Sequence, residues 1–216
     1  MIAFKKIRIY GTLAILITSL GLQSCSDDNV SPTTPPPPVE NEEEVITDLK
    51  LIFTNALDNS DTVTARAKDP DGEGTRSLMV IDSIQLEINK SYLMELQIMN
   101  NLKTPSTNIA KEIKEEDDEH QFFFGFSNNA FMSPAGDGNI DNSADPLNYD
   151  DEDSESQDGS GNPVGLMTSW TTSSNTLSNG SFNVRLQHQP DGIKTATSGA
   201  TDGDTDINIT FVLNIN

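Results

Sequence analysis

The sequence predicts an all-β fold: an antiparallel β-sandwich, immunoglobulin-like or of a related type, with about eight strands and one short connector helix. Three observations support this prediction. From Val45 onward apolar residues alternate with polar ones at a period of two, turn-forming clusters separate the alternating runs, and only residues 107–116 place apolar residues at helical spacing. The length of 216 residues allows one ordinary domain or at most two small ones.

The first and last strands have the clearest alternation. In the first, Leu49, Leu51 and Phe53 share one face with Val45 and Thr47. The last has five apolar residues on one face, namely Ile207, Ile209, Phe211, Leu213 and Ile215. Further strands are expected near residues 62–68, 78–88, 91–99, 120–127, 164–172 and 181–189.

The single helix is predicted over residues 107–116. Ile109, Ala110 and Ile113 have helical spacing and follow Thr107, which is a suitable N-cap. Residues 132–163 form the longest predicted loop, which is acidic and rich in Gly and Ser.

Residues 1–24 are predicted to be a bacterial lipoprotein signal peptide. Basic residues precede the apolar segment Ile9–Leu20, whose 12 residues are too few to span a bilayer as a helix. The segment leads into Leu22-Gln23-Ser24-Cys25, a lipobox-like sequence that predicts cleavage before Cys25 and acylation of its thiol. Cys25 is the only cysteine and our candidate lipid-attachment residue; the alternative is a plain secretory signal with an incidental cysteine.

Residues 25–44 are predicted to be a disordered, lipid-anchored tether. Ser26-Asp27-Asp28-Asn29 resembles the export signal of Bacteroidota surface lipoproteins, which implies an outer-membrane protein facing outward, with the periplasmic face as the alternative. The residues that follow are rich in proline and glutamate, a composition that favours an extended chain and cannot bury a core. The folded domain is therefore expected over residues 45–216.

The charge of the chain limits its partners. It has 34 acidic and 13 basic residues, and its net charge is −21. A chain this acidic does not bind nucleic acid or an anionic membrane surface through a basic patch. Contact with the membrane is therefore expected through the lipid anchor alone.

The two histidines, His120 and His188, each lie at the end of an expected strand. Each shares a strand face with three apolar residues: Phe122, Phe124 and Phe126 for the first, and Phe182, Val184 and Leu186 for the second. Antiparallel pairing in register places Phe126 beside Phe182 and His120 beside His188. Both imidazoles are therefore predicted to meet at one rim of the sheet.

Acidic residues crowd the segment before His120. They are Glu112, Glu115, Glu116, Asp117, Asp118 and Glu119. Imidazole nitrogens beside carboxylates form a mixed ligand set that suits zinc, copper or iron. The candidate metal ligands are His120, His188, Glu116 and Glu119. The alternative is that each histidine caps its strand with a local hydrogen bond while the acids form a solvated loop.

Three segments of the chain carry a resemblance to a known family. The block Asp118–Phe124, the block Arg185–Pro190 and the segment Asn162-Pro163-Val164-Gly165-Leu166 together resemble an uncharacterised family of Bacteroidota lipoproteins, often encoded beside TonB-dependent outer-membrane receptors. The resemblance covers most of residues 45–216 and implies location and neighbours, but no ligand or catalytic residue. Members are often labelled type 1 periplasmic binding fold proteins, a fold with two α/β lobes. The single predicted helix argues against that fold.

A calcium site is a further prediction. Asp69, Asp71 and Glu73 match the opening of a calcium-binding loop, although Val80 occupies the position where a bidentate Glu closes such a loop. Two other acidic groups with alternate spacing, Asp137/Asn139/Asp141 and Asp202/Asp204/Asp206, are ordinary for an acidic surface.

Catalysis has little support in the sequence. There is no G-x-S-x-G motif, and no cysteine remains once Cys25 is acylated. Sugar binding on an aromatic platform has few candidates, because the strand pattern predicts that Trp170 is half-buried and only Tyr92 and Tyr149 remain. We therefore expect a non-enzymatic binding or accessory module for a TonB-dependent uptake system, with a metal ion as its ligand. A glycan-binding or purely structural surface module is the alternative.

Overall fold

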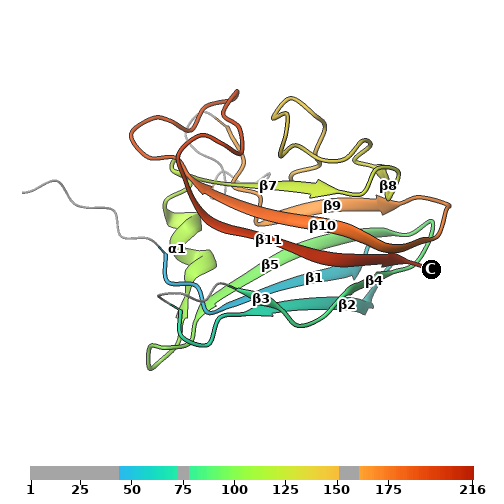
Figure 1. Cartoon of the computed structure of the whole chain (residues 1–216), viewed down its shortest axis with the longest axis horizontal. Helices are drawn as coiled ribbons and strands as arrows, with labels where there is room; N and C mark the ends of the chain where they lie inside the picture. The colour runs from blue at the N-terminus through green and yellow to red at the C-terminus, as the bar shows by residue number, and fades with distance from the viewer. Residues whose placement is uncertain (1–43, 73–77, 151–160) are drawn as a thin grey trace, which may run out of the picture. The chain divides into compact units, whose positions relative to one another are not determined.

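The computed structural model describes residues 44–72, 78–150 and 161–216, which form two β-sheets packed face to face (Figure 1). The first sheet has the strand order β3-β2-β1-β5-β9-β8, with β6 paired to β5, and the second has the order β4-β11-β10-β7. The strands are β1 (Asp48–Asn55), β2 (Asp58–Lys68), β3 (Met79–Val80), β4 (Ile84–Leu86), β5 (Ser91–Asn100), β6 (Thr107–Asn108), β7 (His120–Phe126), β8 (Phe131–Ser133), β9 (Met167–Thr172), β10 (Leu177–His188) and β11 (Asp204–Ile215), and the helix is α1 (Ile109–Glu115). The pairing is antiparallel except between β4 and β11, so the predicted all-β sandwich is confirmed.

The core forms between the two sheets, as the alternation predicted. Every second residue of β1 and β5 is buried, and the five apolar residues of β11 are buried while Asn208 and Thr210 are exposed. Phe53 on β1 meets Phe182 on β10 with their ring centroids 5.9 Å apart. The inner faces of the two sheets therefore share one apolar layer.

Trp170 on β9 lies at the centre of this layer. Its ring contacts four phenylalanine rings, those of Phe124, Phe126, Phe131 and Phe182, at centroid distances of 4.8–5.7 Å. Only 1% of its surface is exposed, so the expectation of a half-buried tryptophan is wrong. Alternation along β9 shows which face the ring lies on, but only the opposing sheet closes over it.

Residues 78–88, predicted as one strand, form two short strands in different sheets. β3 pairs with β2, whereas β4 pairs in parallel with β11. The break comes at Asp82, whose carboxylate accepts a 2.6 Å hydrogen bond from Arg66 Nε, while the Ile81 N–H donates to the Arg66 carbonyl. This contact with β2 ends the first pairing and allows the chain to cross to the second sheet.

Two smaller differences concern the ends of elements. Asn108, not Thr107, caps the helix: its side chain accepts a hydrogen bond from the Lys111 N–H, and Thr107 pairs with Asn100 in the sheet. The predicted strand 164–172 begins as β9 only at Met167, because the preceding residues connect the sheets. The Val164 carbonyl accepts from the Phe122 N–H on β7, and the Leu166 carbonyl accepts from the Leu96 N–H on β5.

The described part of the long loop, up to Asp150, packs on β7. The Phe126 N–H donates to the Asp137 carbonyl at 2.7 Å, and the Asn139 N–H donates to the Phe124 carbonyl at 2.8 Å. The buried Asn139 side chain also accepts from the Phe124 N–H. Because β7 is the last strand of its sheet, these bonds satisfy an edge that would otherwise pair with another chain.

Two glycines of this loop provide a matched test of how closely it packs. Gly136 and Gly138 have φ angles of +99° and +100°, but a Cβ on Gly138 would lie 2.0 Å from the Phe124 carbonyl oxygen, whereas one on Gly136 would meet nothing within 4 Å. Backbone strain alone should cost Gly136→Ala about 1 kcal/mol, and Gly138→Ala should lose about 2–4 kcal/mol. Denaturant unfolding measures both, and equal losses would contradict the close contact.

Candidate metal centre

The predicted pairing of the two histidine strands is confirmed. β7 and β10 are antiparallel neighbours, and the register sets Phe126 opposite Phe182 and His120 opposite His188. The matched apolar faces specify this register, because a shift of one residue would turn the phenylalanines away from the core. The two imidazoles therefore lie side by side at one end of the sandwich, the end where α1 lies (Figure 1).

The histidine rings stack on each other. Their centroids are 4.7 Å apart and the ring planes differ by 20°. His120 is 2% exposed and His188 is 8% exposed. His120 Nδ1 lies 3.2 Å from the Glu116 carbonyl oxygen, and because that oxygen can only accept, Nδ1 donates.

Both predicted carboxylates lie beside the pair. Glu116 is the C-cap residue of α1, and its Oε2 lies 3.7 Å from His120 Nδ1. Glu119 precedes β7, and its Oε2 lies 3.3 Å from His188 Nε2. The structure therefore places Glu116 beside His120 and Glu119 beside His188. Among the described residues, however, the group close enough to share an ion contains only His120 and Glu116 of the four predicted ligands, and neither His188 nor Glu119 belongs to it.

Two further carboxylates belong to the same site, and sequence reasoning missed both. Glu44 had been assigned to the disordered tether, yet its carboxylate, that of Glu116 and a ring nitrogen of His120 all lie within 4.8 Å of one another. Asp206 Oδ2 lies 3.9 Å from His120 Nε2, with its side chain 3% exposed. We call the six residues His120, His188, Glu44, Glu116, Glu119 and Asp206 the histidine rim.

A β-bulge explains the position of Asp206. β10 and β11 pair in register from Phe182 to Leu186, which is opposite Ile207, but Gln187 is opposite Thr205. Asp206 is the extra residue, and a bulge of this kind redirects a side chain that regular alternation would turn to solvent. No sequence pattern indicates the bulge. The sequence analysis therefore grouped Asp206 with Asp202 and Asp204 as acidic residues of the surface.

The rim shifts the pKa of several of its groups. Burial, together with the neighbouring His188 and Lys194, lowers the pKa of His120 to about 4. Burial and the carboxylates of Glu112, Glu116 and Asp206 raise the pKa of Glu44 to about 7. Burial and the neighbouring Glu119 also raise the pKa of Glu116. At neutral pH the His120 imidazole is therefore uncharged, and it lies among carboxyl groups whose pKa values are raised by burial and by their mutual repulsion.

This arrangement suits a cation chemically. A metal ion needs deprotonated ligands, and His120 is neutral throughout the physiological range. To hold a metal, Nδ1 must give up the proton that it donates to the Glu116 carbonyl. In the other neutral tautomer the proton is on Nε2, 3.9 Å from Asp206 Oδ2, and a carboxylate in that position can orient an imidazole whose other nitrogen holds a metal. Positive charge would also relieve the repulsion between Glu44 and Glu116.

The predicted calcium residues are placed only in part. Asp69 Oδ1 accepts a hydrogen bond from the Asp71 N–H at 3.2 Å, which is a local turn contact. Glu73 lies outside the described residues. Within the ranges described above, neither Asp69 nor Asp71 belongs to a group of three ligands close enough to share an ion.

A second acidic group occurs in the long loop. Asp137, Asp141 and Asp145 have carboxylate oxygens within 4.8 Å of one another, and none of the three is buried. Asn139, which sequence spacing placed with them, is buried and holds the loop to β7 instead. Exposed acidic groups of this kind are common without an ion.

The predicted signal peptide (residues 1–24), the candidate lipid-attachment residue Cys25 and the rest of the predicted tether up to residue 43 lie outside the described residues. In the portion of the chain that is described, no helix is long and apolar enough to cross a membrane.

No protein-family model, curated protein or solved structure matches this chain.

Proposed function

We propose that this protein is a lipid-anchored, non-enzymatic binding module of the outer membrane that binds a transition metal ion at the histidine rim and serves a TonB-dependent uptake system. One observation carries the metal assignment. A ring nitrogen of His120 and the carboxylates of Glu44 and Glu116 lie within 4.8 Å of one another, and His188 stacks directly on His120.

The ligand types favour zinc, copper or iron over calcium. Imidazole nitrogen is a borderline ligand that these metals bind well, whereas calcium is bound almost entirely by oxygen. In zinc sites metal–nitrogen and metal–oxygen distances are about 2.0–2.2 Å, so two ligand atoms on one ion lie about 3.3 Å apart at a tetrahedral angle. The 3.7 Å between His120 Nδ1 and Glu116 Oε2 needs only a small adjustment, together with the shift of the imidazole proton from Nδ1 to Nε2.

The cellular part of the proposal rests on sequence features. The lipobox-like segment before Cys25 supports lipid anchoring, and the acidic residues after it support the outer face of the outer membrane. The resemblance to lipoproteins encoded beside TonB-dependent receptors supports a role in uptake. The three segments that carry this resemblance are neighbours in space: β7 pairs with the end of β10, and the Phe122 N–H donates to the Val164 carbonyl.

A zinc titration of the metal-free protein tests the proposal. Wild-type protein should bind zinc, and the variant carrying both His120→Gln and His188→Gln should bind it about 100-fold more weakly, because both nitrogen ligands are removed. Copper and iron should be titrated in parallel. Equal affinity of wild type and the double variant for all three metals would refute the site.

Adjacent glutamates on α1 provide the matched control. Glu116→Gln should weaken zinc binding about tenfold or more, since it removes a ligand of the rim. Glu115→Gln should leave zinc affinity unchanged, because the exposed Glu115 side chain forms a salt bridge with Lys111 instead. The two changes are chemically identical and one residue apart, so a general effect of negative charge would weaken binding equally in both.

A further inference from the structure

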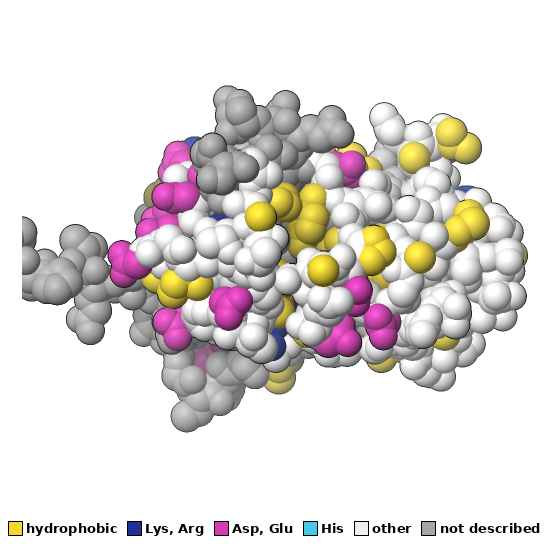
Figure 2. Space-filling view, turned by 90° about the horizontal axis from the view of Figure 1, so that it is seen from above, with side chains coloured by type: hydrophobic (Ala, Val, Ile, Leu, Met, Phe, Trp, Pro, Cys, Tyr) yellow, Lys and Arg dark blue, Asp and Glu magenta, His cyan; other side chains and the backbone are white. Residues whose placement is uncertain are grey.

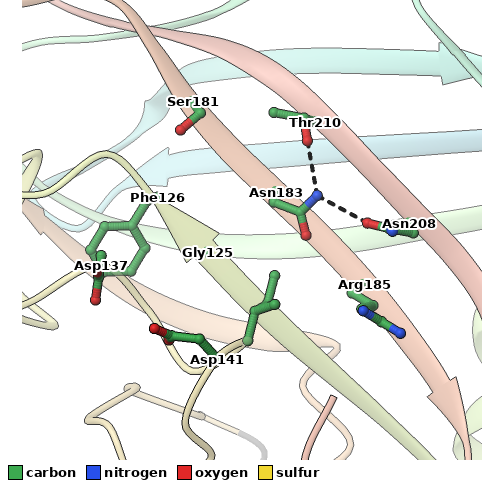
Figure 3. A pocket seen from close by; sticks show the side chains of 10 residues that line it. Gly125, Phe126, Asp137, Asp141, Ser181, Asn183, Arg185, Asn208 and Thr210 are labelled. Carbon is green, nitrogen blue, oxygen red and sulfur yellow. Dashed lines mark hydrogen bonds between the residues drawn. The ribbon is translucent and has the colours of Figure 1, made fainter. Parts of the chain in front are cut away.

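A second site candidate lies on the outer face of the sheet that carries the histidines. Gly125 is five residues beyond His120 on β7, about 17 Å along the strand at 3.3–3.4 Å per residue. Here the loop residues around Asp141 stand beside the outer faces of β10 and β11 and leave a groove of about 390 Å³ (Figure 3). Small-molecule sites in proteins have volumes of roughly 300–1,000 Å³.

The loop wall of the groove is held by β7. Backbone hydrogen bonds on both sides of Gly138 join the loop to Phe124 and Phe126. The absence of a side chain at Gly125 allows Ile140 of the loop to pack against β7. A Cβ added at Gly125 would lie only 3.1 Å from Ile140 Cδ1. Ile140 gives the groove an apolar patch.

Hydrogen bonds within the floor of the groove orient its polar groups. Asn183 Nδ2 donates to Asn208 Oδ1 at 3.1 Å and to Thr210 Oγ1 at 2.9 Å. The side-chain oxygen Oδ1 of Asn183 therefore remains as the acceptor that faces the groove (Figure 3). The side-chain NH₂ group of Asn208 and the hydroxyl group of Thr210 still have protons to donate to a ligand.

Arg185 is fixed at the edge of the same floor. Its Nε donates to Gln187 Oε1 at 3.2 Å and its Nη2 to Thr205 Oγ1 at 3.0 Å. Other guanidinium N–H groups remain for a ligand, since arginine has five. Asp141, across the groove, supplies an acceptor of opposite charge (Figure 3).

This lining matches a ligand with many hydroxyl groups and no charge. Each sugar hydroxyl both donates and accepts, so it uses the acceptors Asn183 and Asp141 together with the donors Asn208, Thr210 and Arg185. Anionic ligands are disfavoured by Asp137 and Asp141 at the groove and by the net charge of −21. Acidic side chains also outnumber basic ones on the face drawn in Figure 2.

We propose that this groove binds a neutral saccharide, with Ile140 contacting the apolar face of a sugar ring and Asn183, Arg185, Asn208 and Asp141 bonding to its hydroxyls. The site needs no aromatic platform. It is independent of the histidine rim, which lies on the inner face at the far end of β7.

A glycan array probed with the full-length protein in detergent tests this proposal. The array carries neutral oligosaccharides of hexoses and N-acetylhexosamines beside sialylated and sulfated ones. Binding to neutral members is expected, and the best one is then titrated by calorimetry. If the protein binds no glycan, or only the sialylated or sulfated ones, the proposal is wrong.

Three variants locate the binding. Asn183→Ala should weaken binding of the best neutral glycan about tenfold. Thr210→Trp should abolish it by filling the groove from an exposed position where an aromatic residue suits a strand. Val212→Ala, two residues further along the same face of β11, should leave binding unchanged. Full affinity in Thr210→Trp would place the sugar elsewhere and overturn the proposal.

The two proposed sites are separable in the same protein. Thr210→Trp should retain zinc binding, which also shows that this variant is folded. The variant with His120→Gln and His188→Gln should retain saccharide binding. Failure of one site therefore leaves the other testable.

Discussion

Replacing Trp170 with alanine should destabilise the protein by about 3–5 kcal/mol, the range for truncating a large buried aromatic residue. The ring is 1% exposed and contacts four phenylalanines from both sheets. Its Nε1–H also donates a 2.7 Å hydrogen bond to Thr168 Oγ1, which is itself buried. The variant loses the packing of both sheets and leaves a cavity between them.

Denaturant unfolding measures this loss, and Leu57→Ala is the control. Leu57 is a large apolar residue that is 96% exposed at the turn between β1 and β2, so its truncation should change stability by less than about 0.5 kcal/mol. A loss of under 1 kcal/mol for Trp170→Ala would mean that the sheets do not close over the ring.

Two groups of the histidine rim should give opposite pH dependences of stability. The pKa of His120 is about 4 in the folded protein, below its ordinary value of 6.5. Between these values the unfolded chain binds more protons, so acidification destabilises the fold. The contribution of His120 is lost as pH falls from 6.5 to 4 and amounts to roughly 3 kcal/mol.

Glu44 acts in the other direction. Its pKa is about 7 in the folded protein, above its ordinary 4.5, so the folded protein binds more protons between these values. Its contribution is present below pH 4.5 and is lost as pH rises to 7. The two contributions therefore oppose each other between pH 4.5 and 6.5.

Single variants should separate the two contributions. Between pH 7 and pH 4, His120→Gln should lose roughly 3 kcal/mol less stability than wild type, because its buried imidazole no longer resists protonation. Glu44→Gln should lose more than wild type, because the compensating carboxyl is gone. Denaturant unfolding at a series of pH values in EDTA measures both, and parallel curves for all three proteins would contradict the burial of the rim.

The sequence predicted both the pairing of the two histidine strands and the register in which they pair. Each histidine ends an apolar strand face of the same length, and one antiparallel register alone buries both faces. The stacking of His120 on His188 follows from that register. The first and last strands were predicted equally well, because apolar and polar residues alternate along most of each strand.

The short strands were predicted less well from the sequence than the long ones. β8 has three residues and was missed, and 78–88 had enough apolar residues for one strand but forms two. In both regions the pairing partner decides where a strand begins, and partners such as β9 or β11 are distant in sequence. Local pattern holds little information about such pairings.

Sequence alone determined the fold class, the register of β7 and β10, and the position of Glu116 and Glu119 beside the two histidines, because each depends on periodicity within a strand or on a few adjacent residues. Only the tertiary structure decided that Glu44 and Asp206 join them and that Trp170 is fully buried. The physical reason is that Glu44 reaches the rim from the start of the domain, Asp206 is redirected by a bulge between paired strands, and Trp170 is covered by the opposite sheet. Contacts of this kind are set by how the two sheets pack, which no local pattern encodes.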